Sequence, residues 1–424
     1  MITDPLISEA LLQFIWRYGY FNRQELYTTA GEPLTILFAG NWNKDQGPDF
    51  TAAKIRIGTI LLAGQVEVHI RASDWYRHTH GPDPHYRHTI LHVVWIDDMP
   101  VDLPTLVLEP LVPVHLLQRY QQLLFQPSWI PCHPQLPALN ELAWYAWKER
   151  LVVSRLERKT AQLLEKLAAL KTHWEELCWQ QLAAGFGRKV NTLLFEQVAV
   201  SLPISLLARH RNKLHQLEAL LLGQARLLEG KPKDGYQQLL QTEFLFLQQK
   251  YRLAQIRTAP AFLRMRPAGF PTIRLAQLAM LLHTQEHFFA QCRQAGDWRN
   301  LQQLLAVEAG DYWHHHYCFG KATAKAAPVL GSAMQQNLLI NVLIPLLFAD
   351  AHQQQQTDRK ERLIHWLYQL PAEQNTIIRY WKQANIPART AMDTQALLEL
   401  YTQYCVNKRC LDCAVGNKIL GPGV

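Results

Sequence analysis

The chain has 424 residues, of which 48% are hydrophobic and 18% charged, and this composition is typical of a soluble globular protein with two or three domains. Its seven cysteines are too scattered for a disulfide scaffold, and the first twelve residues lack the features of a secretion signal. The longest apolar run, 338–349, is too short to span a bilayer and is interrupted by Asn341 and Pro345. We therefore expect a cytoplasmic protein without a membrane segment.

The first 126 residues have the pattern of a small mixed-sheet domain. Apolar residues at helical spacing predict a helix over 5–18. Alternating residues predict a strand over 51–57, and Gly58-Thr59 turns it into a hairpin partner over 60–71. The other expected elements are a strand over 34–38, a polar loop over 40–47, a short helix over 82–88, and strands over 89–96 and 104–108.

Helical periodicity dominates from about residue 139 onward. The expected helices cover 139–170, 174–185, 190–201, 214–228, 237–255 and 273–295, with no further strand pattern. The proline-rich segment 127–138 is the expected linker. The predicted organisation is therefore α+β, with a small mixed-sheet domain over 1–126, a linker, and an all-helical region over 139–424.

Carboxylates and imidazoles concentrate near the predicted hairpin, where six of the 18 histidines lie between His69 and His92. Glu67 and His69 are two residues apart on one strand and share a face, and Asp49 directly precedes the neighbouring strand. A hairpin can bring these carboxylates together around one Mg²⁺ or Mn²⁺ ion, which polarises a phosphodiester and lowers the pKa of bound water. His69 is then placed to orient or deprotonate that water. The plainer interpretation is a turn-capping Asp49 and structural histidines.

The same residues resemble a nuclease signature. Pro48-Asp49 followed by Glu67-Val68-His69 resembles the PD-(D/E)XK nucleases, with histidine in place of the usual lysine. The set Pro48-Asp49-Phe50, His69, Trp75, His78 and His80 is similar to the very-short-patch repair endonucleases, although the loop from His69 to Trp75 is longer here. The resemblance implies a restriction-endonuclease-like domain in which Asp49 and Glu67 hold the metal. His69 takes the lysine position, and His78 or His80 faces the phosphate or handles a proton.

Further polar residues near this group, expected in supporting roles, are Glu9, Asp74, Trp75 and Asp83. The chain as a whole also resembles a bacterial family of unknown function, which implies that its two parts belong together. The segments that carry this likeness are 47–50, 64–69, 73–80, 92–95, 264–274, 313–317 and 405–416.

A cysteine motif lies near the end of the chain. Cys405, Cys410 and Cys413 have C-x₄-C-x₂-C spacing, which suits Zn²⁺ or an iron–sulfur cluster. The fourth ligand would come from a distance, and the candidates are Cys132, Cys318, His133 and His316. Buried thiols packed beneath a helix are the plainer interpretation.

Basic residues dominate beyond residue 110. Residues 1–110 contain 8 Lys or Arg and 13 Asp or Glu, whereas the remainder contains 35 and 22. Arg264, Arg266 and Arg274 surround a Pro-Gly loop that leads into a helix, an arrangement suited to phosphate. A loop pinned by ordinary ion pairs is the alternative.

Together these patterns predict a metal-dependent phosphodiesterase that acts on nucleic acid. One alternative is a catalytically inactive nuclease-like scaffold, and another is a zinc hydrolase that uses the His69–His92 cluster. The nuclease requires the Asp49 and Glu67 carboxylates to converge within about 5 Å. The zinc enzyme requires imidazole nitrogens about 2 Å from one point. In the scaffold the carboxylates lie apart or pair with Arg56 or Arg71.

Overall fold

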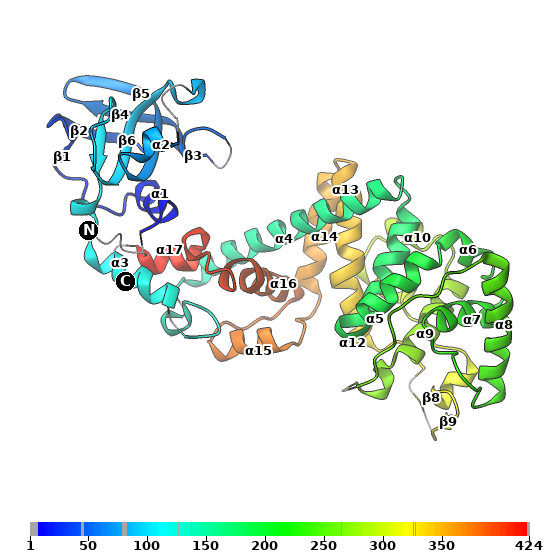
Figure 1. Ribbon diagram of the computed structural model, residues 1–424. Helices are drawn as coiled ribbons and strands as arrows, with labels where there is room; N and C mark the ends of the chain where they lie inside the picture. The colour runs from blue at the N-terminus through cyan, green and yellow to red at the C-terminus, as the bar shows by residue number, and fades with distance from the viewer. Residues whose placement is uncertain are drawn as a thin grey trace. The chain divides into compact units, whose positions relative to one another are not determined.

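The computed structural model describes residues 7–43, 46–78, 83–125, 127–136, 138–263, 265–324, 326 and 328–421. It confirms the α+β class, because an N-terminal mixed sheet is followed by a mostly helical chain (Figure 1). His80 and Arg264, both named as site residues from the sequence, lie outside the described residues.

The chain forms two compact units. The first comprises residues 1–147, 380–386 and 398–424, and the second comprises 148–379 and 387–397. The units are divided at residues other than 126 and 139, the boundaries expected from the sequence. The last segments of the chain pack with the N-terminal unit. The hydroxyl of Tyr20, for example, donates a hydrogen bond to Asn417 Oδ1 over 2.7 Å. Within the expected linker Ile130 is fully buried, so this segment is part of the first unit's core.

The sheet of the first unit has seven strands in the order β1-β2-β4-β5-β6-β7, with β3 also paired to β4. Strands β4 and β5 are antiparallel, whereas β5, β6 and β7 run parallel. The strands are β1 Leu26–Tyr27, β2 Pro33–Phe38, β3 Asn41–Trp42, β4 Phe50–Ile57, β5 Ile60–Arg71, β6 Thr89–Ile96 and β7 Thr105–Val107.

Buried and exposed residues alternate along β4 as the sequence predicts. Ala53, Ile55 and Ile57 are buried, whereas Lys54 and Arg56 are exposed. Gly58 takes a φ of 56° and closes the tight turn to β5, a conformation that glycine adopts without strain. The predicted hairpin is confirmed.

Helix α1, Glu9–Tyr18, packs on β5 together with the short helix α2, Asp74–Arg77. Ser8 caps α1, because its hydroxyl accepts a hydrogen bond from the amide of Leu11, and Gly19 ends it with a φ of 64°. The two helices explain why β5 is buried on both faces from Val66 to His69, although its first half is largely exposed.

The remaining helices are listed here in chain order. They are α3 Val114–Phe125, α4 Glu141–Ala169, α5 Trp174–Ser201, α6 Ile204–Ala208, α7 Leu214–Gln224, α8 Gly235–Tyr251, α9 Pro271–Thr284, α10 Phe288–Gln294, α11 Trp298–Leu304, α12 Ser332–Leu338, α13 Ile344–Gln353, α14 Thr357–Gln369, α15 Thr376–Gln383, α16 Ala391–Glu399 and α17 Ala414–Leu420.

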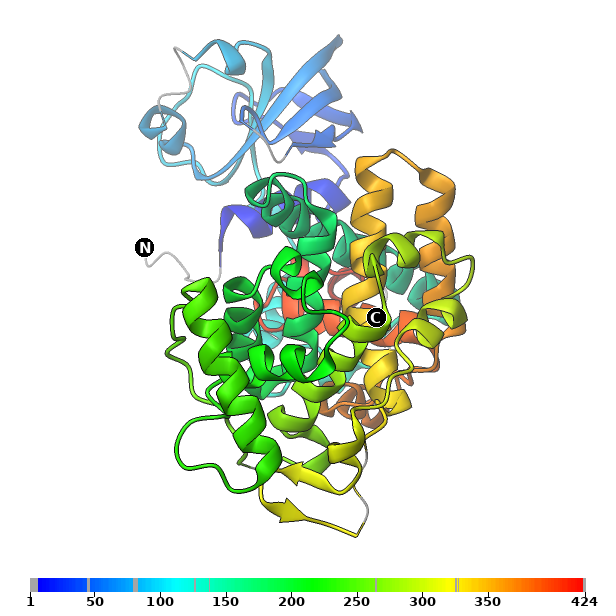
Figure 2. The ribbon, with the colours of Figure 1, turned by 90° about the vertical axis from the view of Figure 1, so that its right-hand side faces the viewer.

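The break expected between the helices over 174–185 and 190–201 is present inside α5, where Arg188 and Asn191 have non-helical φ and ψ angles. Three details differ from the sequence-based elements. The helix expected over 82–88 is a single 3-10 turn, Pro84–Tyr86. The helix expected over 273–295 is broken into α9 and α10, because His287 adopts a φ of 48°. A small hairpin, β8 His316–Cys318 and β9 Lys321–Ala322, also occurs in the second unit (yellow in Figure 2).

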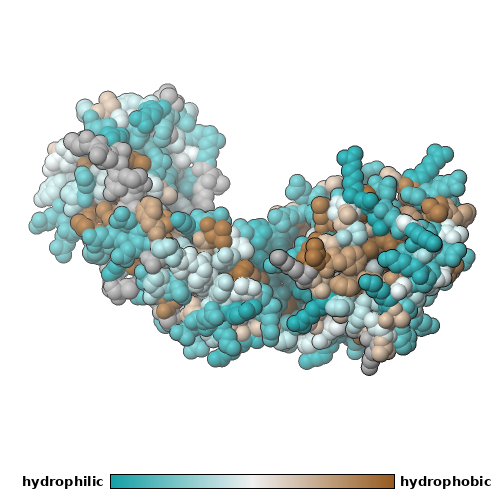
Figure 3. Space-filling view, turned by 60° about the horizontal axis from the view of Figure 1, so that its bottom comes forward, coloured by the Kyte–Doolittle hydropathy of each residue, from teal (hydrophilic) through white to brown (hydrophobic). Residues whose placement is uncertain are grey.

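One helical stretch, Ser332–Gln353, is long and apolar enough to cross a membrane, and 72% of its most apolar window is buried inside the protein. Asn341 and Pro345, which interrupt the apolar run of the sequence, leave the helix continuous, because a π-helical turn over Leu339–Leu343 accommodates the proline that follows it. This is the pattern of a buried core helix and is compatible with a soluble protein. The face shown in Figure 3 is mostly hydrophilic, with small hydrophobic patches.

Candidate metal centre

A β-bulge aligns the two carboxylates that the sequence singles out. The pairing of β4 with β5 is regular from Ile57 to Ala53 and then shifts by one residue, so that Phe50 pairs with Val66. Ala52 lies in the bulge and has a φ of 56°. The shift keeps Phe50 in the core and places Asp49 opposite Glu67. Because side chains alternate along a strand, the regular register would have put Phe50 on the Glu67 face instead.

Direct hydrogen bonds fix this pair. The amide of Asp49 donates to Glu67 Oε2 over 3.0 Å, and the amide of Val68 donates to Asp49 Oδ2 over 3.1 Å. The side-chain amide of Gln13, from α1, donates to Asp49 Oδ1 over 2.8 Å. Arg71, which the scaffold alternative pairs with these carboxylates, lies 3.6 Å from Asp98.

Glu9 brings a third carboxylate to the pair. It begins α1 and raises the pKa of both Asp49 and Glu67, in each case in addition to the larger effect of burial. Asp49 further raises the pKa of Glu67, and burial also raises the pKa of Glu9 itself. Three negative charges in a half-buried site repel one another, and a bound divalent cation would relieve this repulsion.

Imidazoles border the carboxylates. His69 Nε2 lies 3.5 Å from Glu67 Oε1, and His69 Nδ1 lies 2.9 Å from His92 Nε2. If His69 carries its proton on Nδ1, that atom donates to His92. The Nε2 atom of His69 is then an acceptor that faces the Glu67 carboxylate. Because both rings are nearly fully buried, the orientation of His69 is held firmly.

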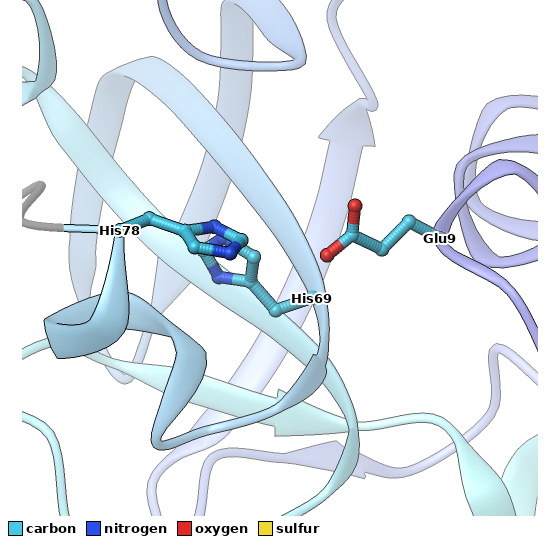
Figure 4. Close-up of side chains that lie close together, drawn as sticks. All are labelled: Glu9, His69 and His78. Carbon is cyan, nitrogen blue, oxygen red and sulfur yellow. The ribbon is translucent and has the colours of Figure 1, made fainter.

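A second possible ligand set overlaps the first. Glu9, His69 and His78 each offer one ligand atom, and these atoms all lie within 4.8 Å of one another. Figure 4 shows the two imidazoles overlapping in this view and the Glu9 carboxylate extended toward them, with His69 on β5 and His78 directly after α2. The site therefore contains an oxygen-rich part at Asp49 and Glu67 and a nitrogen-rich part at His69 and His78.

The expected supporting residues have mainly structural contacts. Asp74 accepts a hydrogen bond from the Arg71 amide and pairs with Arg77 at 2.8 Å. Trp75 is buried with its ring 5.5 Å from that of His92. Asp83 caps the 3-10 turn by accepting from the His85 amide.

Two neighbours of the carboxylates were not expected from the sequence as site residues. Gln13 lies four residues after Glu9, so helical spacing alone places the two on one face of α1. Tyr86 lies close enough to Glu67 and Asp49 that their charges, together with burial, raise its pKa to about 12. Nothing in the local sequence of Tyr86 signals this position.

Of the arginines predicted to contact phosphate, the described Arg266 and Arg274 lie in the second unit. Arg266 is exposed before a 3-10 turn, whereas Arg274 is partly buried in α9 and donates to Gln277 over 3.0 Å. Burial and the neighbouring Arg188 lower the pKa of Arg274 to about 10. Among the described residues, its buried Nε has no hydrogen-bond partner. Arg188 lies at the break inside α5, between the two helices expected from the sequence, but nothing in the sequence signals its approach to Arg274.

Comparisons with known proteins give one match. A family model described as "Protein of unknown function (DUF2851)" matches residues 9–376, a range that includes all the carboxylates and histidines of the site. No curated protein and no solved structure matches the chain significantly.

Proposed function

The chain belongs to the DUF2851 family, and we propose from its own residues that it is a divalent-metal-dependent phosphodiesterase that acts on nucleic acid. The observation that supports this proposal is the direct hydrogen bonding that holds Asp49 beside Glu67, with the charge of Glu9 acting on both carboxylates and the imidazole of His69 3.5 Å from Glu67. Oxygen ligands of this kind are those that Mg²⁺ and Mn²⁺ prefer. The proposal places the chain mechanistically near the PD-(D/E)XK nucleases that its motif resembles.

Each residue has a role in this proposal. Asp49 and Glu67 hold the metal, which supplies a Lewis acid for the phosphodiester and a more acidic bound water. The Gln13 and Val68 donors hold the Asp49 carboxylate in place. His69 accepts or orients a proton through Nε2, and its contact with His92 fixes the ring. His78 is exposed and is the residue placed to meet a substrate phosphate.

The basic second unit supports a nucleic-acid substrate. Burial and the neighbouring Arg188 guanidinium make it less favourable for Arg274 to stay charged unless an anion lies beside it. A phosphate would supply both the anion and an acceptor for the buried Nε of Arg274.

A cleavage assay tests the proposal. The full chain is incubated with single- and double-stranded DNA and RNA in Mg²⁺, in Mn²⁺ and in EDTA. We expect cleavage of at least one substrate with either metal and none in EDTA. Binding without cleavage under all metal conditions would favour the inactive scaffold over the enzyme.

Arg274→Gln is expected to weaken the binding of a labelled oligonucleotide several-fold and to reduce the slope of log K against log salt by about 1. The reason is the loss of one phosphate contact. Binding is measured by fluorescence anisotropy in the presence of EDTA, which removes the metal and so prevents cleavage. Arg299→Gln is the matched control, because Arg299 already pairs with Asp297 at 2.8 Å. Equal affinity of the Arg274 and Arg299 variants would exclude the proposed contact.

The second candidate function is a zinc hydrolase, which the grouping of Glu9, His69 and His78 favours, since two imidazoles and a carboxylate form a common zinc donor set. For that enzyme, His78→Ala is expected to remove bound zinc and activity, whereas Asp49→Asn keeps the zinc. For the magnesium enzyme, Mg²⁺-supported cleavage survives His78→Ala at a reduced rate. Zinc content by mass spectrometry, measured beside the cleavage rate, distinguishes the two.

A further inference from the structure

Four of the seven cysteines gather in the first unit. Cys132 precedes a 3-10 turn after α3, Cys405 ends a π-helical turn, Cys410 begins another 3-10 turn, and Cys413 directly precedes α17. Each of the four is at most 8% exposed, and each is a free thiol. They come from chain segments about 270 residues apart, so their meeting is a property of the fold.

The four thiols lie within electrostatic reach of one another. Cys132 lies close enough to Cys410 and Cys413 to interact with them electrostatically. Cys405 lies within the same reach of the other three. Packing of a hydrophobic core does not require four thiols in one place. A metal site does require them, and the bound metal compensates for the negative charge of the thiolates.

Backbone amides near the four cysteines are placed to donate hydrogen bonds to sulfur. The amides of Val415 and Gly416 donate toward the Cys413 sulfur, and the indole of Trp147 lies beside the same atom. A Cβ at Gly416 would lie 2.0 Å from the carbonyl oxygen of Cys410, so only glycine lets the start of α17 close over this loop. Hydrogen bonds from amides to cysteine sulfur are one means by which proteins tune iron–sulfur centres.

The spacing and the separation of the sulfurs favour an iron–sulfur cluster over a single zinc ion. Tetrahedral zinc with Zn–S bonds of about 2.3 Å draws its sulfur atoms to within roughly 4 Å of one another. Among the described residues, the group of three or more ligand atoms found within 4.8 Å of one another is Glu9, His69 and His78, and it contains no cysteine. An iron–sulfur cluster spreads its four thiolates over two or four iron atoms, so that they are not all drawn around one ion, and C-x₄-C-x₂-C with one distant cysteine is a known spacing for it.

We propose that Cys132, Cys405, Cys410 and Cys413 ligate an iron–sulfur cluster. Iron and inorganic sulfide enter together, and the four thiols lose their protons as they bind. The cluster joins the segment after α3 to the end of the chain, where α17 packs against α3 (Figure 1). It therefore closes a loop of about 270 residues and holds the C-terminal segment on the first unit.

The experiment uses the full chain, purified without oxygen and reconstituted with sulfide and a mixture of ferric and ferrous iron, then desalted. We expect about two or four iron atoms and as many acid-labile sulfides per chain, with visible absorbance that dithionite bleaches. Cys132→Ser and Cys410→Ser should lose most of the iron and sulfide. Cys318→Ser is the matched control, because Cys318 lies in the second unit, and it should keep both.

Three results would overturn the proposal. They are zinc bound to the purified wild-type chain without sulfide, no retained iron after reconstitution, or full iron and sulfide in the Cys132→Ser variant. If a serine variant fails to fold, as judged by circular dichroism, the iron and sulfide content of the wild-type chain decides the question by itself.

Discussion

Asp49→Asn is expected to lower the rate of metal-dependent cleavage by about two to three orders of magnitude, equivalent to ~3–4 kcal/mol of transition-state stabilisation. Asparagine keeps the size of the side chain, and its amide oxygen can still accept from the Val68 amide, while its NH2 group can donate to the Gln13 side chain if that amide turns over. The substitution therefore removes the negative charge that binds the metal while leaving the local fold in place. The rate is measured under single-turnover conditions with saturating Mn²⁺.

Asp98→Asn is the matched control for this substitution. Asp98 is an exposed carboxylate of the same unit, bonded to Ser73 just after β5, and its variant should cleave at the wild-type rate. Cleavage that survives Asp49→Asn undiminished would show that the activity comes from another site or another protein.

Glu67→Gln is expected to remove much of the pH dependence of stability of the metal-free protein. Burial raises the pKa of Asp49 to about 6, and burial with the Asp49 charge raises that of Glu67 to about 8, against about 4 in the unfolded chain. The folded state holds these protons more tightly. Their stabilising contribution is therefore complete below about pH 4 and is lost as the pH rises through 6 to 8. The loss is on the order of a few kcal/mol.

Calorimetric melting in EDTA between pH 5 and 8.5 measures this effect. The wild-type Tm should fall with rising pH more steeply than that of Glu67→Gln, and Mg²⁺ should stabilise the wild type most at high pH. Glu218, buried in the second unit with a pKa raised to about 7, contributes equally to both proteins and cancels in the comparison. Glu32→Gln, at an exposed position, is the control. If the Tm of wild type and of Glu67→Gln changed with pH in the same way, the proposed repulsion between the Asp49 and Glu67 carboxylates would be refuted.

The hairpin and its two carboxylates were predictable because their signals are local. Alternation in β4, the Gly58 turn and the spacing of Glu67 and His69 on one strand each depend on neighbouring residues. The α+β class followed from the change of period near residue 139. The bulge at Ala52 was not predictable, because an exposed alanine gives no sign that it adopts a left-handed conformation.

Contacts between residues far apart in the chain could not be predicted either, because no local pattern signals them. The spacing of Cys405, Cys410 and Cys413 was visible, but only the fold selects Cys132 from among the four candidates for a fourth ligand. The return of residues 398–424 to the first unit has no periodic signal. Arg188 reaches Arg274 only through the kink in α5.

The position of a bound metal tests the central claim most directly. Crystals of the full chain grown with Mn²⁺ would give an anomalous difference map in which the ion appears as a single strong peak. We predict this peak between the carboxylates of Asp49 and Glu67, and its loss in Asp49→Asn. A map without a peak there, or with its only peak among Glu9, His69 and His78, would contradict the magnesium-type phosphodiesterase.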